Sequence, residues 1–267
     1  MSLLVVADVL GQVDEGLSKP SPLVTDRPDQ TESSIAVRPG VIQVELGWLY
    51  TSETEVGTEL KTHTVPQSLL RIGVIPGLEA RVGFAGWMRS ELVDRQDPAS
   101  TTAATNGVGD LELGFKYQVP QPDGSRADLA ILGGATVPTG QAGFGSERVD
   151  PNIRLSFSTA LGPRVSLGSN IGASWTSSGT TSGTETLVDL LYTAVVGVAL
   201  TNRFGAFAES FGGVALEASR PSTHAFDGGV TFLVSPNFQL DMSGGVGLSA
   251  AAADWFVGAG MAFRVGR

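Results

Sequence analysis

Apolar and polar residues alternate along most of this chain, and the clearest run spans residues 109–119. In that run Asp110, Glu112, Gly114, Lys116 and Gln118 alternate with Leu111, Leu113, Phe115, Tyr117 and Val119. A period of two places successive side chains on opposite faces of a β-strand. The same alternation recurs at residues 152–159, 238–245 and 254–264. No period of 3.6 residues persists over a useful window, so the pattern predicts an all-β chain.

Dividing this alternation at turn residues predicts about twelve strands. Their ranges are 40–51, 65–76, 79–90, 107–119, 126–137, 150–161, 164–175, 187–200, 205–214, 223–234, 237–248 and 253–265. Short connections rich in Gly, Pro or Asn, which preset turn dihedrals, alternate with longer ones. The longer connections are predicted at 52–64, 91–106, 138–149 and 176–186.

Long strands joined alternately by short turns and long loops are typical of outer-membrane barrels, which also have an even strand count. Strands in soluble sheets are usually only about 5–6 residues long. We therefore predict a closed antiparallel up-and-down transmembrane β-barrel of about 12 strands over residues 37–267. Residues 1–36, rich in Asp, Pro, Ser and Thr, are expected to form an irregular leader. We interpret this leader as a signal-peptide remnant followed by a periplasmic segment.

Charged residues within the predicted strands fall mostly on one face. A charge at mid-bilayer on the lipid face costs roughly 2–4 kcal/mol, so the charged face is expected to line the lumen. The lumen-lining candidates are Glu45, Arg71, Arg81, Asp110, Glu112, Lys116, Asp128, Arg154, Asp189 and Asp241, with Glu79, Asp227 and Arg264 on the same face. Both signs are present, which predicts a mixed polar network in place of a single-sign selectivity ring.

Large aromatic residues lie near the ends of several predicted strands. They are Trp48, Tyr50, Trp87, Tyr117, Trp175 and Trp255. Such residues form girdles at the two membrane interfaces of outer-membrane barrels. The alternative is a soluble sheet with one solvated face, whose apolar face would need a second layer to cover it.

The chain has 267 residues, no cysteine and a formal net charge of -10. A nucleic-acid partner would need a basic face, so none is expected. The missing cysteines exclude disulfides and thiolate metal ligands. No uncharged apolar run reaches about 18 residues, so no transmembrane helix is predicted. A barrel strand, however, crosses a bilayer with only about 9–11 residues, half of them apolar.

Candidate chemistry is sparse. The two histidines, His63 and His224, are far apart in sequence, so neither a zinc site nor any other metal site is predicted. Gly107-Val108-Gly109 falls short of a dinucleotide fingerprint and precedes no helix. We predict no catalytic residue and no cofactor. An alternative keeps His224 and a neighbouring serine as a hydrolytic pair.

Four blocks of the sequence resemble one family, the outer-membrane transporters linked to the meta-pathway of phenol degradation. The blocks are Val24-Thr25-Asp26-Arg27-Pro28-Asp29-Gln30-Thr31-Glu32-Ser33 followed by Pro39-Gly40, then residues 107–117, 137–140 and 254–260. The resemblance covers roughly residues 22–267. It implies a closed outer-membrane barrel that helps hydrophobic or aromatic compounds to cross.

The leading hypothesis is therefore an outer-membrane channel or passive transporter for small, hydrophobic or aromatic solutes. Its partners would be outer-membrane lipid and the solute. Three alternatives stay open: a structural barrel whose lumen is plugged, a barrel-embedded lipid hydrolase that uses His224, and a soluble periplasmic barrel of lipocalin type with its ligand inside.

Overall fold

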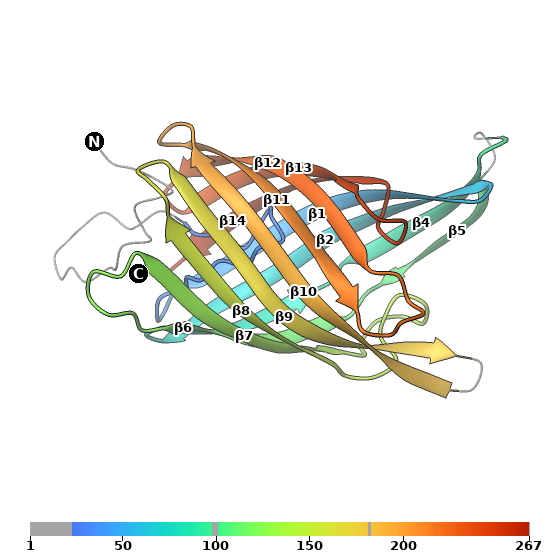
Figure 1. Cartoon of the computed structure of the whole chain (residues 1–267), viewed down its shortest axis with the longest axis horizontal. Helices are drawn as coiled ribbons and strands as arrows, with labels where there is room; N and C mark the ends of the chain where they lie inside the picture. Colours follow the sequence, from blue (N-terminus) through green and yellow to red (C-terminus); the bar gives the residue numbers. More distant parts are fainter. Residues whose placement is uncertain (1–22, 98–100, 181–182, 267) are drawn as a thin grey trace.

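The structure is a computed structural model that describes residues 23–97, 101–180 and 183–266. Its strands form one antiparallel sheet that closes because β1 pairs with both β2 and β14 (Figure 1). The strands are β1 Ile42–Glu55, β2 Thr58–Ile75, β3 Leu78–Phe84, β4 Trp87–Asp94, β5 Thr101–Val108, β6 Leu111–Val119, β7 Ala127–Val137, β8 Asp150–Ala160, β9 Val165–Thr180, β10 Gly183–Ala199, β11 Phe204–Ala215, β12 Thr223–Ser235, β13 Phe238–Gly247 and β14 Trp255–Val265. In the described part of the chain, no helix is long and apolar enough to cross a membrane.

Two of the barrel strands are interrupted. Strands β3 and β4 both pair with β2, and they pair in turn with β6 and β5. Each couple is thus one barrel strand broken at residues 85–86 or 109–110. Gly86 has a φ of 103°, which L side chains rarely adopt. Counting each couple once gives the predicted closed barrel of twelve strands.

Three of the four predicted long loops are wrong, because most of their residues continue the strands. Strands β1 and β2 extend to a tight turn at Val56-Gly57, where Gly57 has a φ of 84°. The β4–β5 and β9–β10 hairpins likewise project beyond the barrel (Figure 1). Beyond the lipid neither face of a strand must be apolar, so the alternation disappears. The threonine-rich composition still favours strand.

The connections sort onto two ends of the barrel. We call the end from which these hairpins project the hairpin end. Both the described start of the chain and the close of β14 lie at the opposite end, which we call the terminal end (Figure 1). Tight turns join β2 to β3 and β12 to β13 at the terminal end.

Polarity is inverted relative to a soluble protein. The lipid-side residues Leu113, Ile153 and Ile171 are 52%, 49% and 59% exposed. In contrast, Arg71 and Lys116 are among the largest fully buried side chains. A polar interior inside an apolar outer face is typical of transmembrane barrels, and it argues against the soluble alternatives.

Interfacial aromatic residues lie on the outer face. Trp48, Tyr50, His63 and Trp255 form one cluster in which the Tyr50 ring centroid is 4.8 Å from His63 and 5.0 Å from Trp255. The Trp48 indole donates a hydrogen bond of 3.3 Å to Nδ1 of His63. Amphipathic rings of this kind favour the membrane–water boundary.

Residues 23–37, which we call the plug, lie inside the barrel without forming a strand (blue in Figure 1). The plug enters at the terminal end, where the Leu23 amide donates to the Pro236 carbonyl in the β12–β13 turn. It returns to the same end, where the Gly40 amide donates to the Gly73 carbonyl near the end of β2. The lumen is therefore occupied by the chain's own backbone on its terminal side.

Candidate functional site

Asp26 of the plug is the centre of a buried ion network. Its Oδ2 atom lies 2.6 Å from Arg81, 2.8 Å from Lys116 and 3.1 Å from Arg71. Its Oδ1 atom accepts hydrogen bonds from the amide and hydroxyl of Ser33, at 2.8 and 2.7 Å. One plug carboxylate thus joins three cations of the barrel wall and also closes a turn of the plug.

Arg71 holds the wall and the plug together. Its guanidinium forms a bidentate pair with Glu79, at 2.8 and 2.9 Å, and contacts Glu45 at 3.3 Å. It also donates to the plug carbonyls of Val24 and Ile35, at 3.2 and 2.7 Å. The planar fork of arginine suits this combination of carboxylate and carbonyl acceptors.

Lys116 depends more heavily on the plug. Its ammonium is fully buried and donates to both oxygens of Asp26 and to the Ser33 hydroxyl. A second plug carboxylate, Glu32, lies 3.9 Å away, and Glu79 of the wall attracts the ammonium from a longer distance. A buried charge that loses its partner is strongly destabilising, so Lys116 stabilises the docked plug.

Arg27 extends over the opposite wall and pairs with Asp241 at 3.3 Å. Its guanidinium lies directly against Gly47 on β1 and Gly260 on β14, which pair across the two strands. A Cβ atom at either glycine would overlap the Arg27 side chain. These two glycines therefore provide the space that this plug residue needs.

The tip of the plug, residues 30–32, is fastened by side chains of β9, β10 and β11. The Gln30 amide donates to Glu209 at 2.6 Å, and the Thr31 hydroxyl contacts both Glu209 and Thr193. The Glu32 amide donates to Asn170 at 2.7 Å. The Gln30 side chain itself is exposed to the lumen.

The structure brings most of the predicted lumen residues to the plug. Those that pair with it directly are Glu45, Arg71, Arg81, Lys116, Arg154 and Asp241. Glu112 lies nearby and accepts a hydrogen bond of 2.9 Å from Asn152. The remaining three candidates, Asp110, Asp128 and Asp189, have partners elsewhere in the barrel.

Asp110 fastens the β7–β8 connection by accepting hydrogen bonds from the amides of Thr139, Gly140 and Ser146, at 2.8, 2.6 and 2.5 Å. Asp128 accepts a long hydrogen bond of 3.4 Å from Gln118.

Asp189 pairs with Arg220 of the β11–β12 loop at 2.9 Å. Arg220 also contacts Glu217 in the same loop, at 2.7 Å. The pairs fix this loop near the hairpin end of the barrel.

Asp26, Glu32 and Glu209 are among the functional residues that were not predicted from the sequence. Asp26 and Glu32 belong to the segment interpreted as a leader, and the tip anchor Glu209 lies on β11. The available signal was the Asp26-Arg27-Pro28 motif, which is conspicuous in an otherwise irregular segment.

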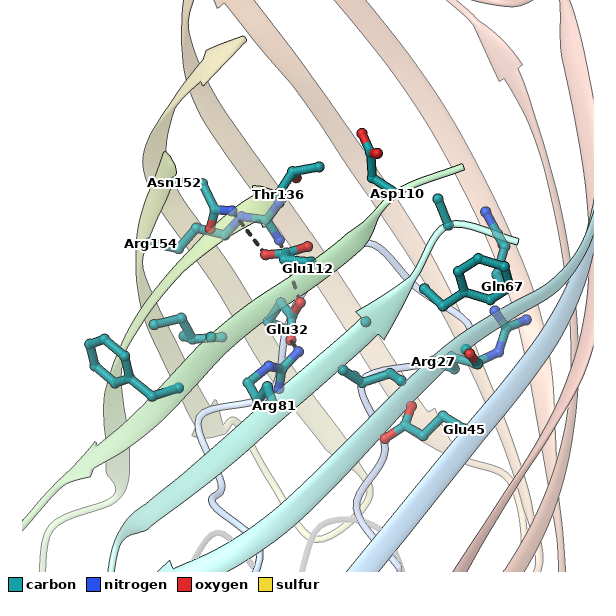
Figure 2. Close-up of a pocket in the computed structure, with 18 of the residues that line it drawn as sticks. Arg27, Glu32, Glu45, Gln67, Arg81, Asp110, Glu112, Thr136, Asn152 and Arg154 are labelled. Carbon is teal, nitrogen blue, oxygen red and sulfur yellow. Dashed lines mark hydrogen bonds and ion pairs between the residues drawn. The ribbon is translucent and has the colours of Figure 1, made fainter. Parts of the chain in front are cut away.

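A charged cavity of about 390 Å³ lies beside the plug (Figure 2). Its labelled side chains include Arg27, Glu32, Arg81, Glu112 and Arg154, which reach it from both the plug and the wall. Positive and negative groups both line this space, so it has a mixed polar lining.

A second cavity of about 520 Å³ lies on the hairpin side of the plug tip, and we call it the apolar cavity because most of its surface is apolar, although Arg154, Asp189 and Arg220 also line it. Phe211 on β11 and Phe256 on β14 form part of its wall, and their ring centroids are 6.1 Å apart. Gln30 lines both cavities. The tip of the plug therefore separates a charged region of the lumen from an apolar one.

The proposed hydrolytic pair is not assembled at His224. The Nδ1 atom of its ring lies 3.0 Å from the Tyr192 hydroxyl, whereas the nearby Ser249 hydroxyl accepts from the His224 backbone amide. Among the described residues, no cluster of three His, Asp or Glu side chains has the geometry to hold a metal ion.

Comparisons with known proteins agree with this architecture. A family model described as "Putative MetA-pathway of phenol degradation" matches residues 25–265. The chain is similar to an outer membrane channel from Pseudomonas putida F1, with a TM-score of 0.66 and 14% identity over 86% of this chain and 97% of that chain. No curated protein matches the sequence.

Two further solved structures share the fold. The NanC porin has a TM-score of 0.54 and 8% identity, over 84% of this chain and all 100% of its own. The translocator domain of the autotransporter NalP from Neisseria meningitidis has a TM-score of 0.50 and 12% identity, over 86% and 90% of the two chains. At such identities the likeness concerns the barrel fold alone.

Proposed function

The chain belongs to the family described as "Putative MetA-pathway of phenol degradation", and from this membership we propose an outer-membrane channel for small apolar and aromatic solutes. The hairpin end faces the outside and the terminal end faces the periplasm, in agreement with the usual placement of long loops and short turns. In this proposal solutes pass through the protein without reacting. Its buried charges hold the plug in position and do not take part in a reaction.

The observation that carries this proposal is the division of the lumen by the plug. Its tip is fixed by Glu209 and Asn170, and the cavities around it measure only about 390 and 520 Å³. A wide aqueous pore would leave the lumen open from end to end. A plugged lumen with an apolar outer cavity instead suits a small solute that is admitted singly.

A structural barrel without transport is the second candidate, and the ion network itself favours it. Asp26, Arg71 and Lys116 are buried and paired, so the docked plug and the barrel wall satisfy each other's charges. The two candidates differ in whether the plug ever leaves its seat while the barrel stays folded.

Uptake by intact Gram-negative cells tests the proposal, because their lipopolysaccharide leaflet slows the entry of apolar compounds. We expect cells that express the barrel to take up a radiolabelled monoaromatic compound faster than cells with an empty vector. A matched aromatic that carries a tetrasaccharide, too large for either cavity, should show no difference. Equal uptake of the small compound in both strains, with the barrel folded in the membrane, would favour the structural role.

A further inference from the structure

We propose that the apolar cavity is a binding site for a neutral aromatic solute of one or two rings. Phe211 and Phe256 hold the ring, and the Gln30 side chain receives one hydrogen-bonding substituent. The inference rests on the proposed function, since it names the solute class and the residues that select it.

The aromatic wall is the first observation. Phe211 and Phe256 meet at an interplanar angle of 66°, in an edge-to-face arrangement. Aromatic rings prefer such tilted or offset contacts, so a third ring can be added to the pair favourably. The Phe256 ring lies against Gly245, where a Cβ atom would overlap it. The glycine therefore lets this ring lie back against the wall and leaves the cavity open.

Much of the remaining wall carries small or aliphatic side chains, among them Leu49, Leu191, Ala225 and Ala251–Ala253, and polar residues such as Thr51 and Thr223 also line it. The cavity volume of about 520 Å³ falls within the range of roughly 300–1,000 Å³ that is usual for small-molecule sites. A compound of one or two rings fits this space, and a long acyl chain would extend beyond it.

The polar floor is the second observation. Gln30 is the exposed residue at the plug tip, and it lines both the charged and the apolar cavity. Its backbone amide is fixed by Glu209 at 2.6 Å, which positions its side chain at the cavity. A primary amide both donates and accepts hydrogen bonds, so it suits a hydroxyl group on the solute.

Charge at the lining favours a neutral solute. Asp189 and Arg220 already pair with each other at 2.9 Å, and Arg154 pairs with Glu32 at 3.5 Å. A carboxylate or ammonium on the solute would have to break one of these pairs or enter an apolar space without a partner. Either course costs free energy.

Fluorine NMR of the full chain in detergent tests the site, with 4-fluorobenzyl alcohol, 4-fluorotoluene and 4-fluorobenzoate as probes. We expect saturable binding of the alcohol above that of empty micelles, and weaker binding of the benzoate. Phe211→Ala and Phe256→Ala should each weaken the binding of the alcohol about tenfold. Phe211→Leu keeps the apolar volume but removes the ring, so its affinity for the alcohol should lie between those of the alanine variants and that of the wild type.

Gln30→Leu separates the polar contact from the apolar one. This substitution should weaken the binding of the alcohol about fivefold, the usual effect of one hydrogen bond, and leave the binding of 4-fluorotoluene unchanged. Phe226→Ala is the matched control, because this phenylalanine is 46% exposed on the outer face of the adjacent strand. It should bind all probes as the wild type does. Heat-modifiable migration on gels confirms that each variant is folded.

Equal binding by folded wild-type, Phe211→Ala and Phe256→Ala barrels would overturn the site, as would binding no greater than that of empty micelles. Unchanged binding of the alcohol by Gln30→Leu would overturn the role of the plug tip. If cellular uptake occurs without binding at this cavity, the inference fails and the proposed function stands. Binding here without uptake would support the site and contradict the proposed function.

Discussion

Asp26→Asn is the most informative single substitution, because it removes one charge and preserves the shape of the side chain. The wild-type carboxylate pairs with Arg71, Arg81 and Lys116 at 3.1, 2.6 and 2.8 Å. In the variant, Arg71 and Arg81 retain wall carboxylates such as Glu79. Among the described residues, Lys116 then keeps a carboxylate within 4 Å only in Glu32, at 3.9 Å.

The expected change in the free energy of plug docking follows from the lost carboxylate partner of Lys116, which is fully buried. Breaking a buried ion pair by removing one partner costs about 3–5 kcal/mol. That cost falls on the docked plug, because the strand-to-strand hydrogen bonds of the barrel do not involve Asp26. At about 1.4 kcal/mol per tenfold change, the docking equilibrium should shift toward the released plug by roughly two to four orders of magnitude.

Single-channel recording in planar bilayers provides the assay. We expect Asp26→Asn to show larger or more frequent conductance steps than the wild type. The double variant Asp26→Asn/Lys116→Met removes both charges, so it should return toward wild-type conductance. Wild-type conductance in folded Asp26→Asn would refute the reasoning that this network seats the plug. Equal conductance of the single and double variants would refute the specific role given to Lys116.

Other predictions concern separate parts of the barrel. Arg81→Glu, at the charged cavity, should shift the reversal potential in a salt gradient toward cation selectivity; an unchanged potential would show that Arg81 does not line the ion path. Gly260→Val should displace Arg27 and raise conductance, whereas Gly258→Val on the same strand, whose Cβ would meet no atom closer than 3.3 Å, should have less effect. Asp110→Ala should speed proteolysis of residues 138–149 without unfolding the barrel, because three backbone amides lose their acceptor; equal cleavage rates would contradict this clamp. Hydrogen bonds from Arg220 and the Val188 amide lower the pKa of Glu217. The ionised Glu217 therefore stabilises the loop fully above the ordinary glutamate pKa of about 4.3, and this stabilisation is lost as the pH falls below it. The rate of cleavage of the 216–222 loop should be constant from neutral pH to about pH 5 and increase only in stronger acid.

Strict alternation made the membrane part of the barrel predictable. Leu111, Leu113 and Phe115 face lipid while Lys116 faces the lumen, and this follows from their positions in one period of two. The interruption at residues 109–110 could not be predicted, because the alternation continues through it. The long hairpins were missed for the converse reason, since their strands leave the lipid that imposes the pattern.

The position of the plug inside the barrel could not be predicted from local sequence pattern. Asp26 is 90 residues from Lys116 in the chain, and no period connects an irregular segment to the wall that encloses it. The charges of the wall were predictable from one strand face. Arg71 and Lys116 hold a segment inside the lumen and do not line an open path. This role could not be predicted, because it depends on closure of the barrel around that segment.

The most direct test of the account is to lock and release the plug during uptake. The chain has no cysteine, and the hydroxyl oxygens of Ser34 in the plug and Ser156 on β8 are 2.8 Å apart. We predict that cells with the Ser34→Cys/Ser156→Cys barrel take up a monoaromatic compound slowly when the disulfide is formed and at the wild-type rate after reduction, with each single-cysteine variant insensitive to reductant. The same uptake rate in the oxidised and reduced states, with the disulfide verified by mass spectrometry, would contradict passage through a lumen that the plug controls.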